Sequence, residues 1–178
     1  MVNKTKIQGL LLIKPKVYKD ERGYFFESFS NKIFNENFKK ICFVQDNESE
    51  STRGVLRGFH FQKPPHDQAK LVRCIKGKVL DVVVDIRKSS KTYGKFEKFI
   101  LSGENKHQLF IPSGFAHAFL VLSDKAIFAY KVDKLYAPEY DSGILWNDPF
   151  LSVDWGIDKE KIIISDKDKN LVSISQFK

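Results

Sequence analysis

The chain of 178 residues has no apolar run long enough to cross a membrane and contains only two cysteines. A spanning helix needs about 20 consecutive apolar residues, so no transmembrane segment is expected. The apolar run near the N-terminus is short and has no small-residue cleavage site, so no signal peptide is expected either. Cys42 and Cys74 lie far apart among apolar neighbours, which predicts buried free thiols rather than a disulfide or a metal pair. These features predict a cytoplasmic protein.

Several sequence signatures of catalysis are also absent. The chain has no Gly-x-Ser-x-Gly motif, no cysteine in an activating context, and no glycine pattern of a phosphate loop or dinucleotide site. Metal-binding barrels often carry two histidines one residue apart on a strand. Here His60 has no such neighbour, and His66 and His107 lie in predicted connections. We therefore expect no metal and no other cofactor.

Basic residues outnumber acidic residues, 30 to 22, which gives a formal net charge of +8. A charge of this sign requires nucleic-acid binding to be considered. The basic residues are interleaved with acids, as in Lys19–Phe26 and Asp166–Asn170, and no run of five occurs. This pattern favours a solvated surface, or a few cationic side chains around a small anionic ligand, over nucleic-acid binding.

Short segments of strand-like composition recur about every ten residues, with turns between them, which indicates a sandwich or barrel. Sixteen phenylalanines suit a sheet-rich core. The length predicts a single domain over 1–178, with a barrel at about 40–135 and a C-terminal segment packing back through Ile162–Ile164. Strands are expected at Lys6–Ile13, Tyr24–Phe29, Ile41–Gln45, Gly54–Gln62, Ala69–Ile75, Val79–Ile86, Phe96–Leu101, Gln108–Ile111, Phe115–Leu122 and Ala126–Val132.

Turn chemistry and helical spacing predict the connections. Ser49–Arg53 is expected to be a loop, and Lys76–Lys78 a tight turn that joins two strands into a hairpin. The two prolines in Lys63–Gln68 keep that connection out of helix and sheet. Asn31–Lys40 is the best helix candidate, with Ser30 or Asn31 as its cap.

The segment Gly54–Gln62 places a histidine on a predicted strand. Strict alternation puts Gly58 and His60 on one face and Arg57 on the other. A histidine here could be a base facing a polar cavity, or a satisfied core or surface histidine. Residue chemistry alone leaves both open.

Other predicted strands offer ionisable groups toward the same interior, since the inward faces of a small barrel meet. His60 is the candidate base, and a carboxylate would orient it, either Asp168 or Asp81. Lys70 or His117 could stabilise an oxyanion.

Three further residues have ordinary alternatives. Tyr130 could be a general acid or a core tyrosine. Arg22 and Arg57 have the fork geometry that suits phosphate, but both could be ordinary surface arginines.

Nine segments follow one another in an order that extends over nearly the whole chain: Asp20–Ser28, Phe43–Asn47, Val55–Gln62, Lys70–Cys74, Asp81–Arg87, Ile111–Phe119, Tyr130–Lys131, Tyr136–Pro138 and Gly143–Pro149. In this order they resemble the dTDP-4-dehydrorhamnose 3,5-epimerases, a family of nucleotide-sugar enzymes. The resemblance implies a mainly β fold, a cupin-like double-stranded β-helix (jelly-roll) barrel with a few short helices.

The resemblance also implies a role for each matching residue. It makes His60 the base that removes protons beside the C4 ketone, Asp168 its carboxylate partner and Tyr130 the acid on the opposite face. It places Lys70 at the enolate oxygen with His117 close by. The implied substrate-binding positions are Arg22, Glu27, Gln45, Asn47, Arg57, Tyr136 and Asp141, the last at a place where relatives can have Glu.

The implied activity is metal-free epimerisation of dTDP-4-dehydro-6-deoxy-D-glucose at C3 and C5, giving dTDP-4-dehydro-L-rhamnose for cell-surface polysaccharide. A homodimer is implied, with an N-terminal strand that could cross to the partner. Three alternatives remain: epimerisation at C3 only, another nucleotide-linked 4-keto sugar, or a non-catalytic sugar-nucleotide-binding barrel. The resemblance requires Arg57 and His60 near one ligand, and a bulge or twist at Gly58 would bring them together.

Overall fold

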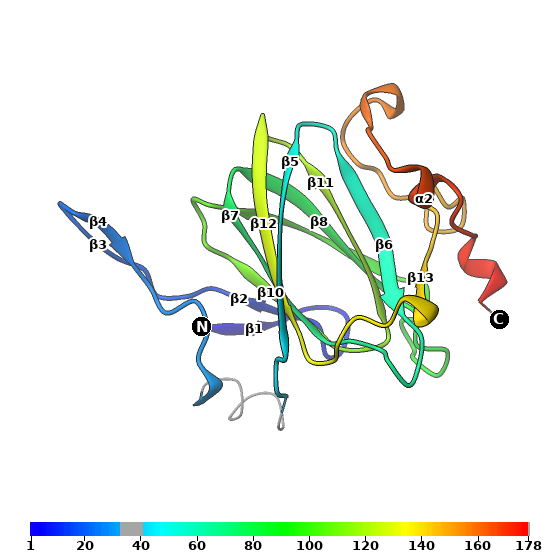
Figure 1. Cartoon of the computed structure of the whole chain (residues 1–178), viewed down its shortest axis with the longest axis horizontal. Coiled ribbons are helices and arrows are strands. Elements are labelled where there is room, and N and C mark those ends of the chain that lie inside the picture. The colour runs from blue at the N-terminus through cyan, green and yellow to red at the C-terminus, as the bar shows by residue number, and fades with distance from the viewer. Residues whose placement is uncertain (33–40, 178) are drawn as a thin grey trace.

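Two antiparallel sheets packed face to face form the body of the protein (Figure 1) in the computed structural model, which describes residues 1–32 and 41–177. The six-stranded sheet has the order β1 (Val2–Lys4), β2 (Leu11–Ile13), β10 (Gln108–Ile111), β7 (Lys70–Lys76), β12 (Lys125–Val132) and β5 (Gln45–Thr52). The five-stranded sheet has the order β13 (Asp141–Gly143), β6 (Leu56–Gln62), β11 (Phe115–Val121), β8 (Lys78–Asp85) and β9 (Phe96–Ser102).

From β5 onward the chain passes repeatedly from one sheet to the other, which is the pattern of a jelly roll. The mainly β, cupin-like fold is therefore confirmed. Helical structure is limited to short pieces, among them η1 (Pro138–Tyr140), η2 (Lys159–Lys161), α2 (Asp166–Lys169) and η3 (Ile174–Gln176). Within the described ranges, no helix has the length and apolar character that crossing a membrane requires.

Both faces of the five-stranded sheet are covered. Its inner face meets the other sheet in a core that includes Val83, Phe119 and Phe128. Its outer face packs against the C-terminal segment through Phe59 and Trp155, whose ring centroids are 5.7 Å apart. Burial on both faces explains why β8 and β11 carry apolar side chains at most of their positions.

Two of the predicted connections are wrong. Gly77, at φ +80°, does form a tight turn, but β7 and β8 belong to different sheets and do not pair as a hairpin. Turn chemistry reports only that the chain reverses, not whether the two strands share a sheet. The predicted loop Ser49–Arg53 lies largely within β5, which pairs with β12 from Gln45↔Val132 to Thr52↔Lys125. Its polar residues indicated a loop, but an edge strand such as β5 can also consist mostly of polar residues.

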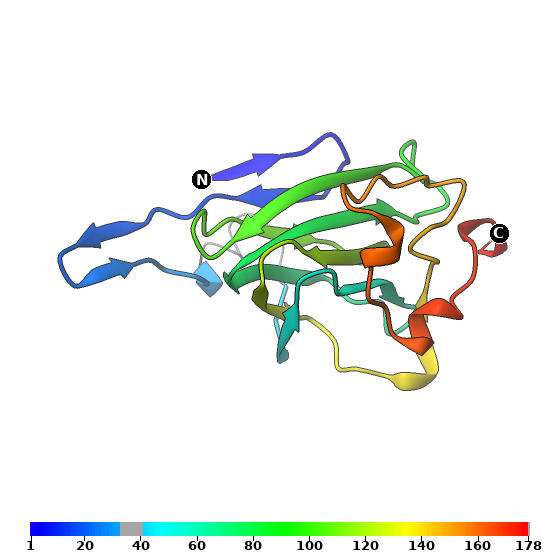
Figure 2. The same cartoon turned by 90° about the horizontal axis from the view of Figure 1, so that it is seen from above.

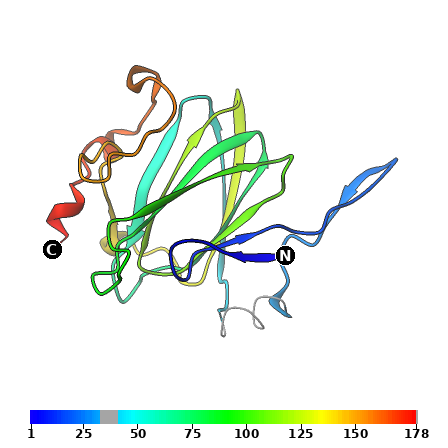
Figure 3. The same ribbon diagram turned by 180° about the vertical axis from the view of Figure 1, so that it is seen from behind.

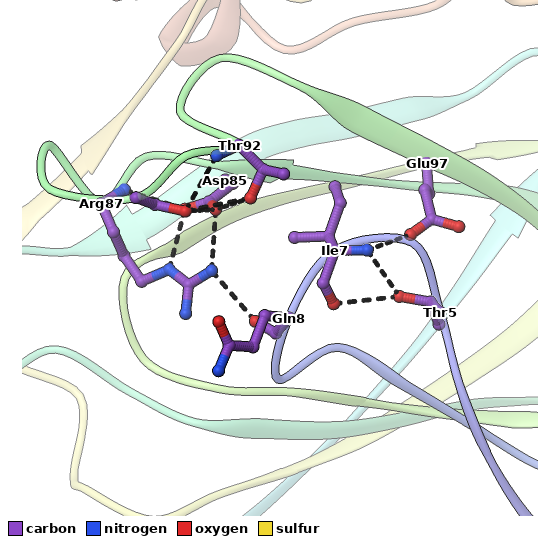
Figure 4. A network of polar contacts seen from close by, with 8 residues as sticks. Thr5, Ile7, Gln8, Asp85, Arg87, Thr92 and Glu97 are labelled. Atoms are coloured by element: carbon purple, nitrogen blue, oxygen red, sulfur yellow. Dashed lines mark hydrogen bonds and ion pairs between the residues drawn. The ribbon is translucent and has the colours of Figure 1, made fainter.

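The N-terminal region also departs from the predicted strands. In place of one strand at Lys6–Ile13, β1 and β2 pair around a bend with Gly9 at φ +96°. The bend is tied to the body because Ile7 N donates to Glu97 at 2.9 Å (Figure 4). The predicted strand Tyr24–Phe29 is limited to β4 (Gly23–Phe25), which pairs with β3 (Tyr18–Asp20) in a hairpin that projects from the body (Figure 2).

The remaining strands lie within about two residues of their predicted bounds, except that the expected Ile41–Gln45 meets β5 only at Gln45. The expected helix Asn31–Lys40 lies outside the described residues from position 33 onward. Both cysteines are free thiols, but only Cys74 is buried; Cys42 is exposed, so its predicted burial is wrong.

Candidate active site

His60 and Asp168 form a hydrogen-bonded pair between β6 and α2. His60 Nε2 lies 2.7 Å from Asp168 Oδ1, and Gly58 N donates to the other carboxylate oxygen at 3.4 Å. Ser165 caps α2 by accepting from Asp168 N. Burial alone would raise the pKa of Asp168, but the contacts with His60, Gly58 and Ser165 outweigh it and lower the pKa. Because Nε2 faces the carboxylate, Nδ1 is the ring nitrogen left to take a proton.

A second buried pair lies beside the first. His117 on β11 is the direct strand partner of His60, and its Nε2 lies 2.8 Å from Asp81 Oδ2 on β8. Residue chemistry left Asp168 and Asp81 as alternative partners of His60, and the family resemblance implied Asp168. The structure pairs His60 with Asp168 and His117 with Asp81. Among the residues that the structure describes, no group hydrogen-bonds the buried Asp81 Oδ1.

Lys70 lies next to both pairs at the start of β7. Its side chain is buried, and Nζ donates to His60 O at 3.3 Å. Burial lowers the pKa of Lys70 to about 8, against the opposing charges of Asp141 and Asp81. The ammonium group is therefore poised to lose its proton just above neutral pH.

Arg57 shares the inner face of β6 with His60, so its predicted placement on the opposite face by strict alternation is wrong. On β11 the partners of His60 and Arg57 are His117 and Phe119, two residues apart, whereas His60 and Arg57 are three apart. The extra residue is a β-bulge at Gly58, one of the two distortions, a bulge or a twist, expected to bring Arg57 and His60 together. Arg57 Nε donates to Ser51 Oγ at 3.1 Å.

Tyr130 faces the same interior from the other sheet. It lies on β12, paired with Asn47 and Val72, and packs against the core between the sheets. Burial raises the pKa of its hydroxyl, while the charge of Arg57 opposes the rise. A histidine from one sheet and a phenol from the other therefore flank one interior.

Polar contacts close the rim of this interior. Gln45 Nε2 donates to Asn47 Oδ1 at 2.9 Å, and Gln45 Oε1 accepts from Tyr136 N at 3.1 Å. Tyr136 Oη donates to Asp141 Oδ2 at 3.0 Å, and Lys167 forms an ion pair with the same oxygen. Four of the predicted binding residues thus meet here.

Two rim residues were not predicted. Lys167 stands next to Asp168 in the sequence, which was the only signal for it. Gln62 is buried on the His60 face of β6; its Oε1 accepts from Ala137 N and its Nε2 donates to His66 O, both at 2.7 Å. This amide holds the loop carrying Tyr136 to the connection after β6.

Arg22 and Glu27 are not brought to this site within one chain. Arg22 is exposed at the tip of the β3–β4 hairpin and pairs with Asp20 of the same hairpin. The hairpin extends away from β6 and α2 (Figure 3). The residues that the structure describes include no cluster of three or more histidine, cysteine or acidic side chains placed to hold a metal ion.

Comparison with known proteins identifies the family. The model of the family dTDP-4-dehydrorhamnose 3,5-epimerase matches residues 4–176. The chain is 55% identical over 168 residues to the enzyme of that name from Methanothermobacter thermautotrophicus, covering 94% of this chain and 90% of the relative. It is 47% identical over 177 residues to the one from Escherichia coli, covering 99% and 95%.

Solved structures agree with this result. The epimerase of Legionella pneumophila in complex with dTDP-4-keto-L-rhamnose superposes with a TM-score of 0.95 at 45% identity, over 100% of this chain and 94% of that chain. A 3′-monoepimerase from Streptomyces bikiniensis in complex with dTDP-quinovose gives a TM-score of 0.91 at 34% identity, over 96% and 86%. The chain belongs to the dTDP-4-dehydrorhamnose 3,5-epimerase family.

Proposed function

We propose that this protein is an isomerase that inverts C3 and C5 of dTDP-4-dehydro-6-deoxy-D-glucose and produces dTDP-4-dehydro-L-rhamnose in the cytoplasm. The observation that carries the proposal is that the His60–Asp168 pair and Tyr130 face the same interior from opposite sheets, with Lys70 hydrogen-bonded to the backbone of His60. Inversion needs a base on one face of the carbon and an acid on the other.

Each inversion is a balanced proton exchange. Nδ1 of His60 takes the proton from the carbon beside the C4 ketone, and the C–H electron pair moves to the ketone oxygen as an enolate. The Lys70 ammonium stabilises that oxygen, and His117 lies beside it. The Tyr130 hydroxyl then delivers a proton to the opposite face, and exchange with solvent restores both groups. Two such rounds, at C3 and C5, complete the reaction.

The rim supplies groups that suit the nucleotide and diphosphate. Arg57 and Lys167 are cations beside the interior, and guanidinium and ammonium groups recognise phosphate. Gln45, Asn47, Tyr136 and Asp141 provide hydrogen-bonding and stacking groups next to them.

We infer further that the protein is a homodimer in which the β3–β4 hairpin completes the partner's site. Tyr24 and Phe25 on this hairpin are exposed, at 55% and 71%. Arg22 and Glu27 would then act in trans.

Light scattering tests whether the protein is a dimer. Mixing the inactive Arg22→Ala and His60→Asn proteins tests the action in trans, and should restore part of the activity because hybrid dimers contain one intact site. No recovery in proven hybrids would contradict action in trans.

The deciding experiment is incubation with dTDP-4-keto-6-deoxyglucose in deuterated water. We expect deuterium at both C3 and C5 of the product, and no exchange with His60→Asn. Deuterium at C3 alone would show the monoepimerase alternative, which one similar structure represents. Binding of the nucleotide sugar without exchange would show a non-catalytic protein.

A further inference from the structure

The sequence segment Gly143–Pro149 has no role in the mechanism above. It contains Asp148, a buried carboxylate that accepts hydrogen bonds on both of its oxygens. Asp148 is 1% exposed. Its Oδ1 accepts from Phe150 N at 2.9 Å and Leu151 N at 3.0 Å, and its Oδ2 accepts from Ile174 N at 2.9 Å. The side chain of Ser173 hydrogen-bonds the same carboxylate. Asp148 thus joins two stretches of chain that are 26 residues apart.

Two more contacts join this segment to the chain that follows Asp168. Leu145 N donates to Val172 O at 3.0 Å. Gly143 lies against Leu171 so closely that an added Cβ would be 2.7 Å from Leu171 Cδ1. The segment Gly143–Asp148 therefore holds residues 171–174 along their whole length.

On the N-terminal side of Asp168, the chain is attached to the start of β6 through Ile163. Ile163 N donates to Gly54 O at 2.8 Å, and Leu56 N donates to Ile163 O at 2.9 Å. Helix α2, which carries Asp168, is only four residues long. A helix of this length is not stable by itself, so its position depends on contacts with the rest of the fold, among them the two attachments that flank it. The C-terminal segment follows the β6–β13 edge of the five-stranded sheet (Figure 3).

We propose that Asp148 is a positioning residue for catalysis: by fixing residues 173 and 174 it holds Asp168 against His60. The inference rests on the proposed function, in which His60 is the base. A carboxylate suits this position because both of its oxygens accept from backbone N–H groups. An asparagine amide would turn an N–H donor toward one of those groups.

The test compares Asp148→Asn with Asp168→Asn, with the double variant and with Asp154→Asn as control, since Asp154 is an exposed aspartate six residues further along the chain. Asp148→Asn should lower kcat about 10- to 100-fold with KM changed less than about threefold, because base catalysis is weakened and substrate contacts are kept. Asp154→Asn should have normal kcat. If Asp148 acts through Asp168, the double variant should be no slower than Asp168→Asn.

Histidine NMR provides a second measurement, since the chain has only four histidines. The His60 Nε2–H signal should be lost in Asp148→Asn as in Asp168→Asn, while the signal of His117, held by Asp81, should persist as an internal control. Normal kcat and an unchanged His60 signal in folded Asp148→Asn would overturn the proposal.

If Asp148→Asn does not fold, Ser173→Ala takes its place because it removes only one hydrogen bond to the carboxylate. A partial loss of kcat with a weakened His60 signal would support the proposal, and no change in either would overturn it. A fully active Asp168→Asn would instead overturn the catalytic role of the His60–Asp168 pair, whatever Asp148→Asn shows.

Discussion

Arg57 and His60 are three residues apart on β6 and share its inner face, because the strand has one residue more than β11 between them. The extra residue is Gly58, at φ +126°. A Cβ at Gly58 would lie 2.5 Å from both Ala118 Cβ and His117 O. Only glycine fits where β6 approaches β11 this closely, and the bulge there brings a cation and a histidine to one face of β6.

Gly58→Ala should therefore be strongly destabilised. The backbone conformation costs an alanine about 1–3 kcal/mol, and the overlap with β11 adds about 1–3 kcal/mol. Gly23→Ala is the matched control, since Gly23 has the same φ of +126° but no atom within 4 Å of its added Cβ. Denaturant unfolding should show the larger loss for Gly58→Ala; equal losses would show that β11 imposes no steric limit.

Lys70 should make activity and stability respond oppositely to pH. Its charge is lost as pH rises through its lowered pKa of about 8, so kcat/KM should fall above that pH. The folded-state pKa lies below the unfolded value of 10.5, so the unfolded chain binds the proton more tightly and stability should rise between pH 8 and 10.5.

Lys70→Met should accordingly raise the free energy of unfolding at pH 7 by up to about 3 kcal/mol while lowering kcat about 100-fold or more. The exposed Lys78→Met serves as control and should change neither quantity. A less stable Lys70→Met protein at pH 7 would contradict the burial penalty assigned to this lysine.

Tyr130→Phe should separate exchange from inversion. His60 can still remove a proton and return deuterium to the same face, so solvent deuterium should still enter the substrate. Formation of inverted product should fall about 100- to 10,000-fold, the usual contribution of a general acid. Tyr93→Phe, on the outer face of the five-stranded sheet, is the control. An equal fall in exchange and inversion would remove Tyr130 from the role of acid.

The buried Asp85 should govern stability in acid. It accepts from Arg87, Ser90 and Thr92, and Arg87 also donates to Gln8 O at 3.0 Å (Figure 4). Burial by itself raises the pKa of Asp85, but these hydrogen bonds lower it to about 2 from 3.8.

A carboxylate with a lowered folded-state pKa stabilises the fold above the unfolded value, and that stability is lost as pH falls through the folded value. About 2 kcal/mol should therefore disappear between about pH 5 and pH 1. Asp85→Asn should be less stable at pH 7 and less sensitive to acid. The measurement is urea unfolding at a series of pH values. Asp124→Asn, which removes one partner of an exposed ion pair, is the control and should unfold as the parent protein does.

Local sequence was sufficient to find most strands and to nominate His60, Lys70 and Tyr130 as candidates, while most of the candidate binding positions came from the family resemblance. Alternation of apolar side chains predicted β6 to β12 nearly to their ends, because successive side chains of a strand point to opposite faces, which differ in their surroundings. It failed at β5, where an edge strand needs few apolar residues, and at Lys76–Lys78, where one turn serves either a hairpin or a change of sheet.

The amino-acid sequence by itself determined the β-rich fold class and that His60, Lys70, Tyr130 and Asp168 were candidates for one site. Residue chemistry left open whether Asp168 or Asp81 pairs with His60, and strict alternation placed Arg57 on the wrong face of β6; the tertiary structure decided both. Both depend on contacts between distant parts of the chain: His60 and Asp168 are 108 positions apart, and the bulge at Gly58 lies where β6 packs closely against β11. A pattern with a two-residue period contains no information about either contact.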